Sequence, residues 1–268
     1  MRKSTFERGI ITLSFDDGRK DTYYVFMDIL KERRLPAVVY IPSGYIECGF
    51  SNPKEIGYNG MMSKDELDSI CNDTLFEIGG HGYMHSNEFE DLEKGVETLR
   101  KWYPQIGNIG LASPHSEINK KYVFENIDIY KKLGFSYVRG GRNFSKFTMF
   151  KRAISLFARK SKLPFAFKGC YQNSVNKQVD YYLHAIPVHK LTTLNQVKAI
   201  VDYCAKKKYW AILEFHGIDS RESIEYEEEF CWAEDDFIVL CDYLKEMQNK
   251  GLLVVKSPLS VLRGTLNG

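Results

Sequence analysis

The stretch GIITLSFDDG at residues 9–18 decides the fold. Its first seven residues form an almost uninterrupted apolar run, as a β-strand buried on both faces of a parallel sheet requires, and two aspartates and a glycine end it. Similar short runs recur along the chain and alternate with longer segments of helical period. The expected strands are 9–15, 37–41, 76–79, 109–113, 136–139, 180–186, 210–215 and 252–255, and the expected helices are about 19–34, 63–73, 88–103, 117–133, 146–161, 192–208 and 234–249.

Seven or eight β/α units in one chain of 268 residues predict an α/β fold of the barrel type, in which parallel strands form a ring inside a layer of helices. A doubly wound open sheet is the alternative. The sequence contains no Gly-Ser-rich or Pro-rich linker, no low-complexity stretch and no short repeat that would mark a domain boundary. We therefore expect residues 1–268 to form a single domain, an irregular (β/α)7-8 barrel, with one oversized connection at about 140–179.

The composition is that of a globular protein with a sizeable core, because 44% of the residues are hydrophobic and 27% are charged. It excludes a disordered chain, a collagen and a coiled coil. No apolar run approaches the roughly 18 residues of a membrane-spanning helix, and the start MRKSTFERGI lacks the apolar stretch of a signal peptide. The six cysteines form no CxxC pair and are typical of reduced thiols rather than of a disulfide framework or a Cys-based metal site. These features together predict a cytoplasmic protein.

The formal net charge of +2 conceals two oppositely charged regions. Residues 130–179 contain twelve Lys and Arg and no Asp or Glu, so the rest of the chain carries a net charge of −10. The acidic residues are densest at 219–236, where nine carboxylates accompany the single cation Arg221. Blocks of like charge are usually solvated surface, but such a concentration of cations also favours an anionic partner.

Active sites of parallel barrels are built from the loops that follow the carboxyl ends of the strands, so chemically capable residues should gather there. The sequence meets this expectation at four strand ends, and four of its six histidines are among the residues concerned. The other two, His184 and His189, match no motif and are interpreted as loop or core residues. The residues at the strand ends are Asp16 and Asp17 in ITLSFDDG, His81 and His85 in EIGGHGYMH, Pro114 and His115 in GLASPHSE, and His216 in WAILEFHG.

His81 and His85 are four residues apart, so their imidazoles share one face if the loop turns helically. A carboxylate from the first strand would then complete a facial site of two histidines and one carboxylate. Three protein ligands leave a position open for water, which is the arrangement of a catalytic rather than a structural zinc, and the metal lowers the pKa of that water toward roughly 7. The other aspartate of the pair is then free to act as a base.

The combination of SFDDG with HGYMH resembles the first two motifs of the NodB-homology polysaccharide deacetylases, carbohydrate esterase family 4. The resemblance extends over about residues 9–256 and implies the irregular (β/α) barrel of that family. By this resemblance, Asp16 would be the general base. The metal ligands would be Asp17, His81 and His85.

The resemblance also covers later parts of the chain. His216 has the position of the family's Leu-x-His motif and would be the general acid that protonates the leaving amine. The backbone N–H of His115 falls where the family's Arg-Pro-Pro-Tyr motif supplies an oxyanion donor, and its neighbour Pro114 would contact the substrate. The implied reaction is attack of a metal-bound water on an acetamide carbonyl, with release of acetate and a free amino sugar.

Four departures from the family pattern indicate a divergent subgroup. Ala112 stands where the family usually carries an arginine that pairs with the catalytic aspartate, and Gly82 replaces the usual Ser or Thr. Glu214 takes the place of the apolar Leu of the acetyl pocket, on the same strand face as the proposed acid. The family's fourth motif is replaced by YVRGGR, which offers Arg139 and Arg142. Glu214 would either orient or charge the imidazole of His216 or contact a polar part of the substrate, and Arg139 is also expected to contact the substrate.

These residues predict a hydrolase of carbohydrate metabolism, a metal-dependent deacetylase that removes an N-acetyl group from a sugar of a surface-polysaccharide or lipopolysaccharide precursor. Zinc is the expected metal, although such ligand sets also accept cobalt, nickel, manganese or iron. One alternative keeps the fold and the metal but changes the bond, as in an O-acetyl esterase or a cyclic-amide or ureide hydrolase. A second alternative is a glycan-binding pseudoenzyme without a metal.

The basic segment allows two interpretations. On a helical wheel, the apolar residues of 146–161 fall on one half and the Lys and Arg residues on the other. The helix would either pack its apolar face against the barrel and expose a solvated basic face, or act as a lid or a peripheral membrane contact that extends over 146–168. The charge predicts that the sugar substrate carries an anionic group. Nucleic acid is not expected as a partner, because no recognition module is present, and the sequence does not indicate the oligomeric state.

Overall fold

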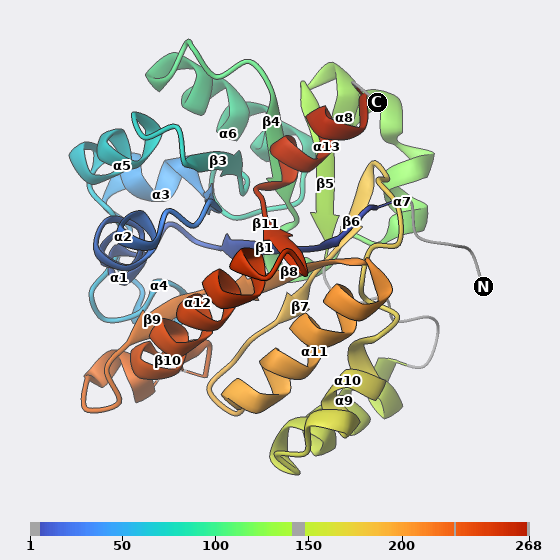
Figure 1. Cartoon of the computed structure of the whole chain (residues 1–268). Coiled ribbons are helices and arrows are strands. Elements are labelled where there is room, and N and C mark those ends of the chain that lie inside the picture. The colour runs from blue at the N-terminus through green and yellow to red at the C-terminus, as the bar shows by residue number, and fades with distance from the viewer. Residues whose placement is uncertain (1–5, 141–147, 228, 267–268) are drawn as a thin grey trace.

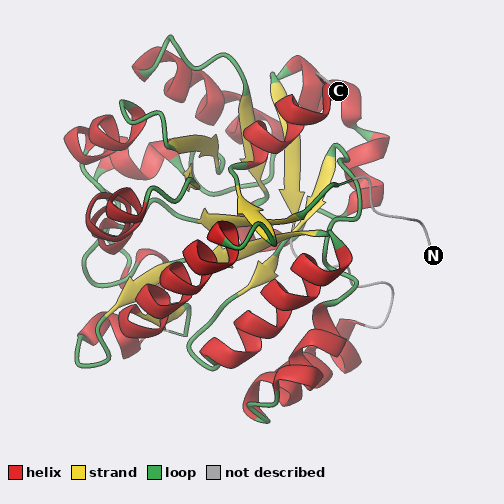
Figure 2. Cartoon of the chain, viewed as in Figure 1, coloured by secondary structure: helices red, strands yellow, loops and turns green. Residues whose placement is uncertain are grey.

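The computed structural model describes residues 6–140, 148–227 and 229–266. Parallel strands occupy the centre of this part of the chain, and helices surround them (Figures 1 and 2). The main sheet consists of β1 (Gly9–Phe15), β2 (Ala37–Ile41), β3 (Phe76–Gly80), β4 (Ile109–Ala112), β5 (Phe135–Gly140), β6 (Tyr182–His184), β7 (Ile186–Pro187), β8 (Trp210–Phe215) and β11 (Leu253–Val255). Its order, β6-β5-β4-β3-β2-β1-β8-β7 with β11 also paired to β1, forms a nearly closed barrel and confirms the predicted α/β barrel. A separate parallel pair consists of β9 (Gly217–Asp219) and β10 (Cys231–Ala233).

The two ends of the sheet meet in one bent segment. The sequence predicts a single strand at 180–186, whereas the structure contains two short strands, β6 and β7, separated by Ala185 alone. β6 pairs with β5 and β7 pairs with β8, so the segment spans the gap between the two ends of the sheet. Asn176 braces the bend, because its side chain donates to the carbonyl of His184 at 3.0 Å and accepts from the N–H of the same residue at 2.9 Å.

The predicted helices are present, together with shorter ones that no periodic pattern indicated. The α-helices are α1 (Lys20–Tyr24), α2 (Lys31–Arg33), α3 (Ser43–Cys48), α4 (Pro53–Ile56), α5 (Lys64–Cys71), α6 (Phe89–Trp102), α7 (Lys120–Glu125), α8 (Ile127–Lys132), α9 (Thr148–Lys160), α10 (Pro164–Tyr171), α11 (Leu194–Lys207), α12 (Glu234–Asn249) and α13 (Pro258–Leu266); η1 (Val25–Leu30), η2 (Pro114–Ser116) and η3 (Ile224–Glu227) are π or 3₁₀ turns. The helix predicted at 117–133 is broken at Asn126 into α7 and α8. Within the described ranges, no helix combines the length and the apolar character that a membrane span needs.

Alternate residues of each strand point into the barrel and toward the helices. In β2, Val38 and Tyr40 belong to a small inner cluster, whereas Ala37, Val39 and Ile41 belong to the large cluster that also contains the apolar residues of the helices. The barrel is therefore a packed core with aromatic side chains at its centre, and its interior is closed to solvent at that level.

The inward-facing positions become polar at the carboxyl ends of the strands. The inward row of β8 ends with Glu214 and His216, and the inward row of β1 ends with Asp16. Ala112 of β4 lies opposite Arg139 of β5 in the register of the sheet. This end of the barrel carries the candidate active site.

Candidate active site

The aspartate pair forms a tight turn at the end of β1. Asp16 and Asp17 are both buried, and Asp17 and Gly18 adopt positive φ values of 70° and 63°. A left-handed backbone is unfavourable for an aspartate, so the surrounding contacts must hold it. The N–H of Asp16 donates to the carbonyl of Phe215 at 2.9 Å, which fixes the turn to the end of β8. The turn directs the Asp17 carboxylate toward the histidines after β3 and the Asp16 carboxylate toward β5.

One carboxylate sets the shape of the histidine loop after β3. Asp91, in the first turn of α6, accepts hydrogen bonds from three backbone N–H groups of the loop, those of Tyr83 (2.8 Å), Met84 (2.8 Å) and Ser86 (3.2 Å). Gly82 has a φ of 76°, and a Cβ atom there would lie 2.6 Å from Asp91 Oδ1. Glycine therefore fits this position where Ser or Thr would be strained.

Three side-chain atoms converge between β1 and β3. Asp17 Oδ1 lies 3.3 Å from His81 Nε2 and 3.5 Å from His85 Nε2, and the two Nε2 atoms are 3.1 Å apart. Donor atoms around a tetrahedral zinc, at bond lengths of about 2.1 Å, are separated by about 3.4 Å. The three atoms therefore form one face of a coordination shell of the size that a divalent metal ion requires.

Hydrogen bonding and burial suit these side chains to a cation. His81 Nδ1 donates to the carbonyl of Ala112 at 2.9 Å, so Nε2 is the nitrogen left for a metal. Burial opposes ionisation of Asp17, but contact with His81 and the other nearby histidines lowers the pKa of Asp17 well below its usual range. Burial lowers the pKa of His85 to about 3, and the neighbouring His81 contributes to the decrease. An ionised carboxylate and a neutral imidazole are the forms in which these groups bind metals.

A second cluster is built around the guanidinium of Arg139. This side chain is fully buried, with Nη2 donating to Asp16 Oδ2 and Nη1 donating to Glu214 Oε2. The guanidinium carbon also lies 5.0 Å from the centre of the Tyr40 ring. The sequence places Arg139 and Glu214 among the substrate-binding residues, whereas in the structure they pair with each other. Ala112 of β4 offers Asp16 no cation, and the cation beside this carboxylate comes from β5, the strand that pairs with β4.

His216 lies next to this cluster. One nitrogen of its ring and carboxylate oxygens of Asp16 and Glu214 are all within 4.8 Å of one another. Its backbone carbonyl accepts a hydrogen bond from Thr22 Oγ1 at 3.2 Å, and its ring centre is 5.1 Å from that of Phe230. The structure thus brings the residues predicted as base and acid, which are distant in the sequence, to the same end of the barrel.

The turn η2 brings a further histidine close to the cluster of Asp17, His81 and His85, which is called the metal-ligand cluster below because its three donor atoms could hold a metal ion. The carbonyl of Pro114 accepts a hydrogen bond from Asn87 Nδ2 at 3.0 Å, and His115 adopts a φ of 55°. The backbone N–H of His115 makes no hydrogen bond to another described residue. Its imidazole lies 4.3 Å from that of His85, measured between ring centres. The sequence indicated only a backbone role for His115, but its side chain also lies near His85. Arg142, the other arginine of YVRGGR, lies outside the described residues.

A sequence model described as polysaccharide deacetylase matches residues 3–138, slightly more than half of the chain. The chain belongs to the polysaccharide deacetylase family. The matched region contains the aspartate pair, the histidine loop and η2 of this family member, whereas Arg139, Glu214 and His216 lie beyond it. The match therefore covers Asp17, His81 and His85 but neither Arg139 of β5 nor the residues of β8.

Several solved structures are similar to this family member at low identity. The deacetylase PplD of Streptococcus pyogenes, in complex with acetate, is 18% identical over 48% of this chain and 54% of its own, with a TM-score of 0.40. A CE4 family pseudoenzyme of Bacillus anthracis is 12% identical over 77% of this chain and 64% of its own (TM-score 0.41). The Xyl-CE4 domain of a multidomain xylanase from the hindgut metagenome of Trinervitermes trinervoides is 12% identical over 97% and 92% (TM-score 0.43). The chain spans about half the length of PplD. A search of curated protein sequences found no match.

His189 is one residue near the site that the sequence did not indicate. It is buried, and its ring centre lies 6.5 Å from that of His216 and 5.0 Å from that of Phe230. The available signal was its place just after a strand, the same place that the predicted site histidines have. That strand, β7, has only two residues, and the sequence predicted it only as the end of a single strand at 180–186.

Tyr45 of α3 is a second such residue. Its ring centre is 6.0 Å from that of His85, and it stacks on Phe50 at 3.9 Å. The two aromatic rings line a pocket of about 330 Å³ together with Lys20 and Lys64. Tyr45 is therefore the lining residue that lies between this pocket and His85.

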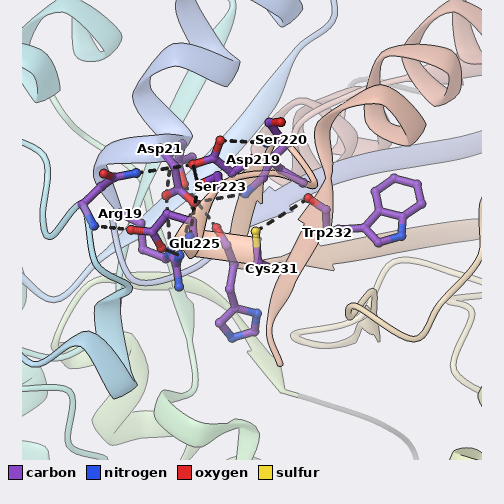
Figure 3. A network of polar contacts seen from close by, with 12 residues as sticks. Arg19, Asp21, Asp219, Ser220, Ser223, Glu225, Cys231 and Trp232 are labelled. Atoms are coloured by element: carbon purple, nitrogen blue, oxygen red, sulfur yellow. Dashed lines mark hydrogen bonds and ion pairs between the residues drawn. The ribbon is translucent and has the colours of Figure 1, made fainter. Parts of the chain in front are cut away.

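A buried network of ion pairs joins the turn after β1 to the loop after β8 (Figure 3). Arg19 pairs with Asp21 at 3.2 Å and with Glu225 at 2.6 Å, and Asp21 Oδ2 accepts a hydrogen bond from the N–H of Ile218 at 3.2 Å. Arg19 and Glu225 are almost inaccessible to solvent, so their charges depend on each other. Glu225, one carboxylate of the acidic segment 219–236, is therefore part of the protein interior. Through Arg19 it helps to hold β9, the strand that follows His216, against the turn that carries Asp16.

Proposed function

We propose that this protein is a divalent-metal-dependent carbohydrate N-deacetylase. The observation that carries the proposal is the convergence of Asp17, His81 and His85 beside a buried carboxylate, Asp16, and a histidine, His216. One cluster fits a metal ion and the other offers a base and an acid, which are the groups that hydrolysis of an amide requires. The substrate would be an N-acetylated sugar of a surface-polysaccharide or lipopolysaccharide precursor in the cytoplasm.

Asp17, His81 and His85 would hold the metal. Two imidazole nitrogens and one carboxylate oxygen are ligands that zinc prefers, and cobalt, nickel, manganese and iron are the alternatives. A divalent ion held there supplies Lewis acidity toward the attacking water and the acyl carbonyl.

Asp16 is suited to the role of general base. Arg139 binds Oδ2 of its carboxylate, while the buried Oδ1 has no hydrogen-bond partner among the described residues. A buried carboxylate oxygen without a partner is costly, so we expect a ligand to occupy the adjacent position. In the proposed reaction, Oδ1 accepts a proton from the attacking water as the water oxygen bonds to the acyl carbon.

His216 would complete the reaction by donating a proton. The sugar nitrogen must take up this proton to leave as an amine when its bond to the acyl carbon breaks. The negative charge that develops on the acyl oxygen would meet the backbone N–H of His115, and removal of such a donor typically costs about 10²- to 10³-fold in kcat. The products are acetate and a free amino sugar.

Two features support a sugar with an anionic group. The pocket beside Tyr45 is lined by Lys20 and Lys64, close to the metal-ligand cluster. The segment 130–179, with twelve cations and no carboxylate, begins in α8 and includes β5, which ends at the same barrel mouth. A nucleotide diphosphate or a lipid-linked pyrophosphate would carry the complementary charge.

The experiment combines metal analysis of the purified protein with acetate release from UDP-linked and lipid-linked N-acetylhexosamines. The wild type should contain a stoichiometric divalent ion and release acetate. Asp16→Asn should keep the metal and lose about 10³-fold in kcat, whereas His81→Ala should lose both metal and activity. Asp128→Asn, at an exposed position of α8, is the matched control and should behave as the wild type.

Absence of both metal and acetate release would contradict the proposal and favour a glycan-binding pseudoenzyme. Release of acetate from O-acetyl esters alone would identify an esterase. Turnover of cyclic amides or ureides alone would identify the remaining alternative on this fold.

A further inference from the structure

Helix α9 has the opposite orientation to that of an ordinary surface helix. Among its residues whose side chains are described, Ser155, Ala158 and Arg159 are buried, whereas Ile154 and Phe157 are exposed. A surface helix normally buries its apolar stripe and exposes its charged face. The sequence pattern leaves both orientations open, and the structure has the one in which apolar side chains face outward.

Specific contacts hold this orientation. Arg159 Nη2 donates to the carbonyl of Pro187, at the end of β7, over 3.0 Å. The carbonyl of Ala158 accepts a hydrogen bond from Gln196 Nε2 of α11 at 2.8 Å. Rotation of α9 to bury Phe157 would break the contact of Arg159 with the barrel, so the exposed ring is a fixed feature of the fold.

The exposed apolar side chains continue onto α10, which lies beside α9 at the outer edge of the molecule (Figure 1). Phe157 and Phe165 are 71% and 67% exposed, more than any other large apolar side chain that the structure describes. α10 is nevertheless anchored, because Phe167 and Tyr171 are buried with their ring centres 4.6 Å apart. The exposed set, here called the α9–α10 patch, consists of Ile154, Leu156, Phe157, Leu163 and Phe165.

Lysines border the patch. Lys160 and Lys162 are exposed where α9 ends and α10 approaches, and Lys168 of α10 is partly exposed. Neither helix nor the connection between them contains an Asp or Glu, as is true of the whole segment 130–179. Exposed apolar side chains, accompanied by lysines and by no carboxylate on the same two helices, are complementary to a surface with an apolar interior and an anionic outer layer.

We propose that the α9–α10 patch docks the protein onto an anionic lipid bilayer. The Phe and Leu side chains enter the boundary between headgroups and acyl chains, and the lysines bind the headgroups. Helix α9 lies at the rim of the candidate active site, because its buried Arg159 contacts the carboxyl end of β7, and the patch is on the exposed face of this helix. Docking does not depend on the proposed chemistry. Its benefit, which is access to lipid-linked sugars, rests on the proposed function.

Vesicle sedimentation of the full chain tests the docking. The wild type should bind vesicles of phosphatidylcholine with phosphatidylglycerol at least tenfold more tightly than phosphatidylcholine alone, and binding should weaken as salt rises. Phe157→Ser/Phe165→Ser should weaken binding at least tenfold, since insertion of both rings is lost. Lys160→Gln/Lys162→Gln should weaken binding to the anionic vesicles by about tenfold. Tyr122→Ser/Phe124→Ser, which removes two exposed rings of α7, is the matched control and should bind as the wild type.

Circular dichroism, metal content and hydrolysis of a soluble substrate should be the same in Phe157→Ser/Phe165→Ser and the wild type, so a failure of docking is distinguishable from a failure of the proposed function. Equal binding to neutral and anionic vesicles, no binding, or full binding by Phe157→Ser/Phe165→Ser would overturn the proposal. A wild-type dimer that this double variant converts to a monomer would also overturn it, since the patch would then be an interface between two copies of the chain.

Discussion

The barrel mouth and the α9–α10 patch both reverse the usual distribution of side chains, but in opposite directions. At the mouth, the charged groups of Asp16, Arg139 and Glu214 are buried. At the patch, the aromatic rings of Phe157 and Phe165 are exposed. The buried charges are paired with one another inside the chain, whereas no part of the described chain covers the two rings.

The difference distinguishes buried charges, which need a partner within the folded chain, from exposed apolar side chains, which are available to other molecules. A buried charge costs several kcal/mol unless a partner compensates it, so the arrangement at the mouth is part of folding. An exposed ring changes the free energy of unfolding little, so its position indicates a binding partner rather than a contribution to stability. Substitutions at the mouth should therefore lower stability and activity, and substitutions at the patch should change neither.

Metal removal is the most severe test of the mouth. If Asp17, His81 and His85 hold an ion, chelation should abolish hydrolysis and lower the free energy of unfolding by about 3–4 kcal/mol, relative to protein with metal at 100 to 1,000 times its Kd. Urea unfolding with and without added zinc measures the change. His81→Ala should show no dependence on zinc. Unchanged stability and full activity of the wild type after chelation would show that the cluster does not bind a metal ion needed for folding or hydrolysis.

Arg139→Met is the next largest test, because it leaves two buried carboxylates without a counter-charge. We expect a loss of about 3–5 kcal/mol in the free energy of unfolding. Adding Glu214→Leu removes one of the carboxylates and should restore part of the loss, which a double-mutant cycle measures. The control is Arg33→Met, whose pair with the exposed Asp242 should be worth no more than about 1 kcal/mol. Equal losses of stability in Arg139→Met and Arg33→Met would contradict the inference that Arg139 compensates the buried charges of Asp16 and Glu214.

Asp91→Ala tests the support of the histidine loop. Three backbone N–H groups lose their acceptor, so we expect a loss of about 2 kcal/mol in stability and a 10- to 100-fold weaker affinity for the metal. Metal titration monitored by calorimetry gives the affinity. Glu90→Ala alters an exposed carboxylate in the same helical turn and serves as the comparison. A variant with wild-type affinity would mean that the loop keeps its shape without Asp91.

The smallest effect is expected at the patch. Phe157→Ser/Phe165→Ser should change the free energy of unfolding by no more than about 0.5 kcal/mol, because both rings are already in water. Phe167→Ala, in the buried face of α10, should cost about 3–5 kcal/mol by contrast. Denaturant unfolding of the three proteins measures both values. A large loss in the double variant would show that the two rings stabilise the fold.

The convergence of Asp17, His81 and His85 could be predicted from the sequence, because all three residues follow the ends of predicted strands. The strand before Asp16 and Asp17 and the strand before His81 are apolar runs, and parallel strands bring their carboxyl ends together. Two ligands four residues apart then need only a turn to meet. The same reasoning gave His216, at the end of another apolar strand.

Other parts of the site depend on distances that a sequence pattern does not contain. Arg139 reaches Asp16, 123 positions away in the chain, because the register places β5 at the right height, and a shift of one residue would point it to the opposite face. For α9, a helical wheel gives the two faces but not which one is buried. That choice is made by Arg159 at Pro187 and by Gln196 at Ala158, and these contacts form only in the folded chain.

The pairing of β4 with β5 also limits how such a site can vary among related chains. Ala112 and Arg139 are neighbours across the ladder, and both positions face the space beside Asp16. Arg139 already pairs with both buried carboxylates, Asp16 and Glu214, so a second guanidinium in that space would lie beside a like charge. Arginine on one strand therefore requires a small side chain on the other, and the two positions should vary reciprocally. The arginine that pairs with the catalytic aspartate can in this way come from either of two adjacent strands. A motif defined on one strand alone would then indicate only that the arginine is missing.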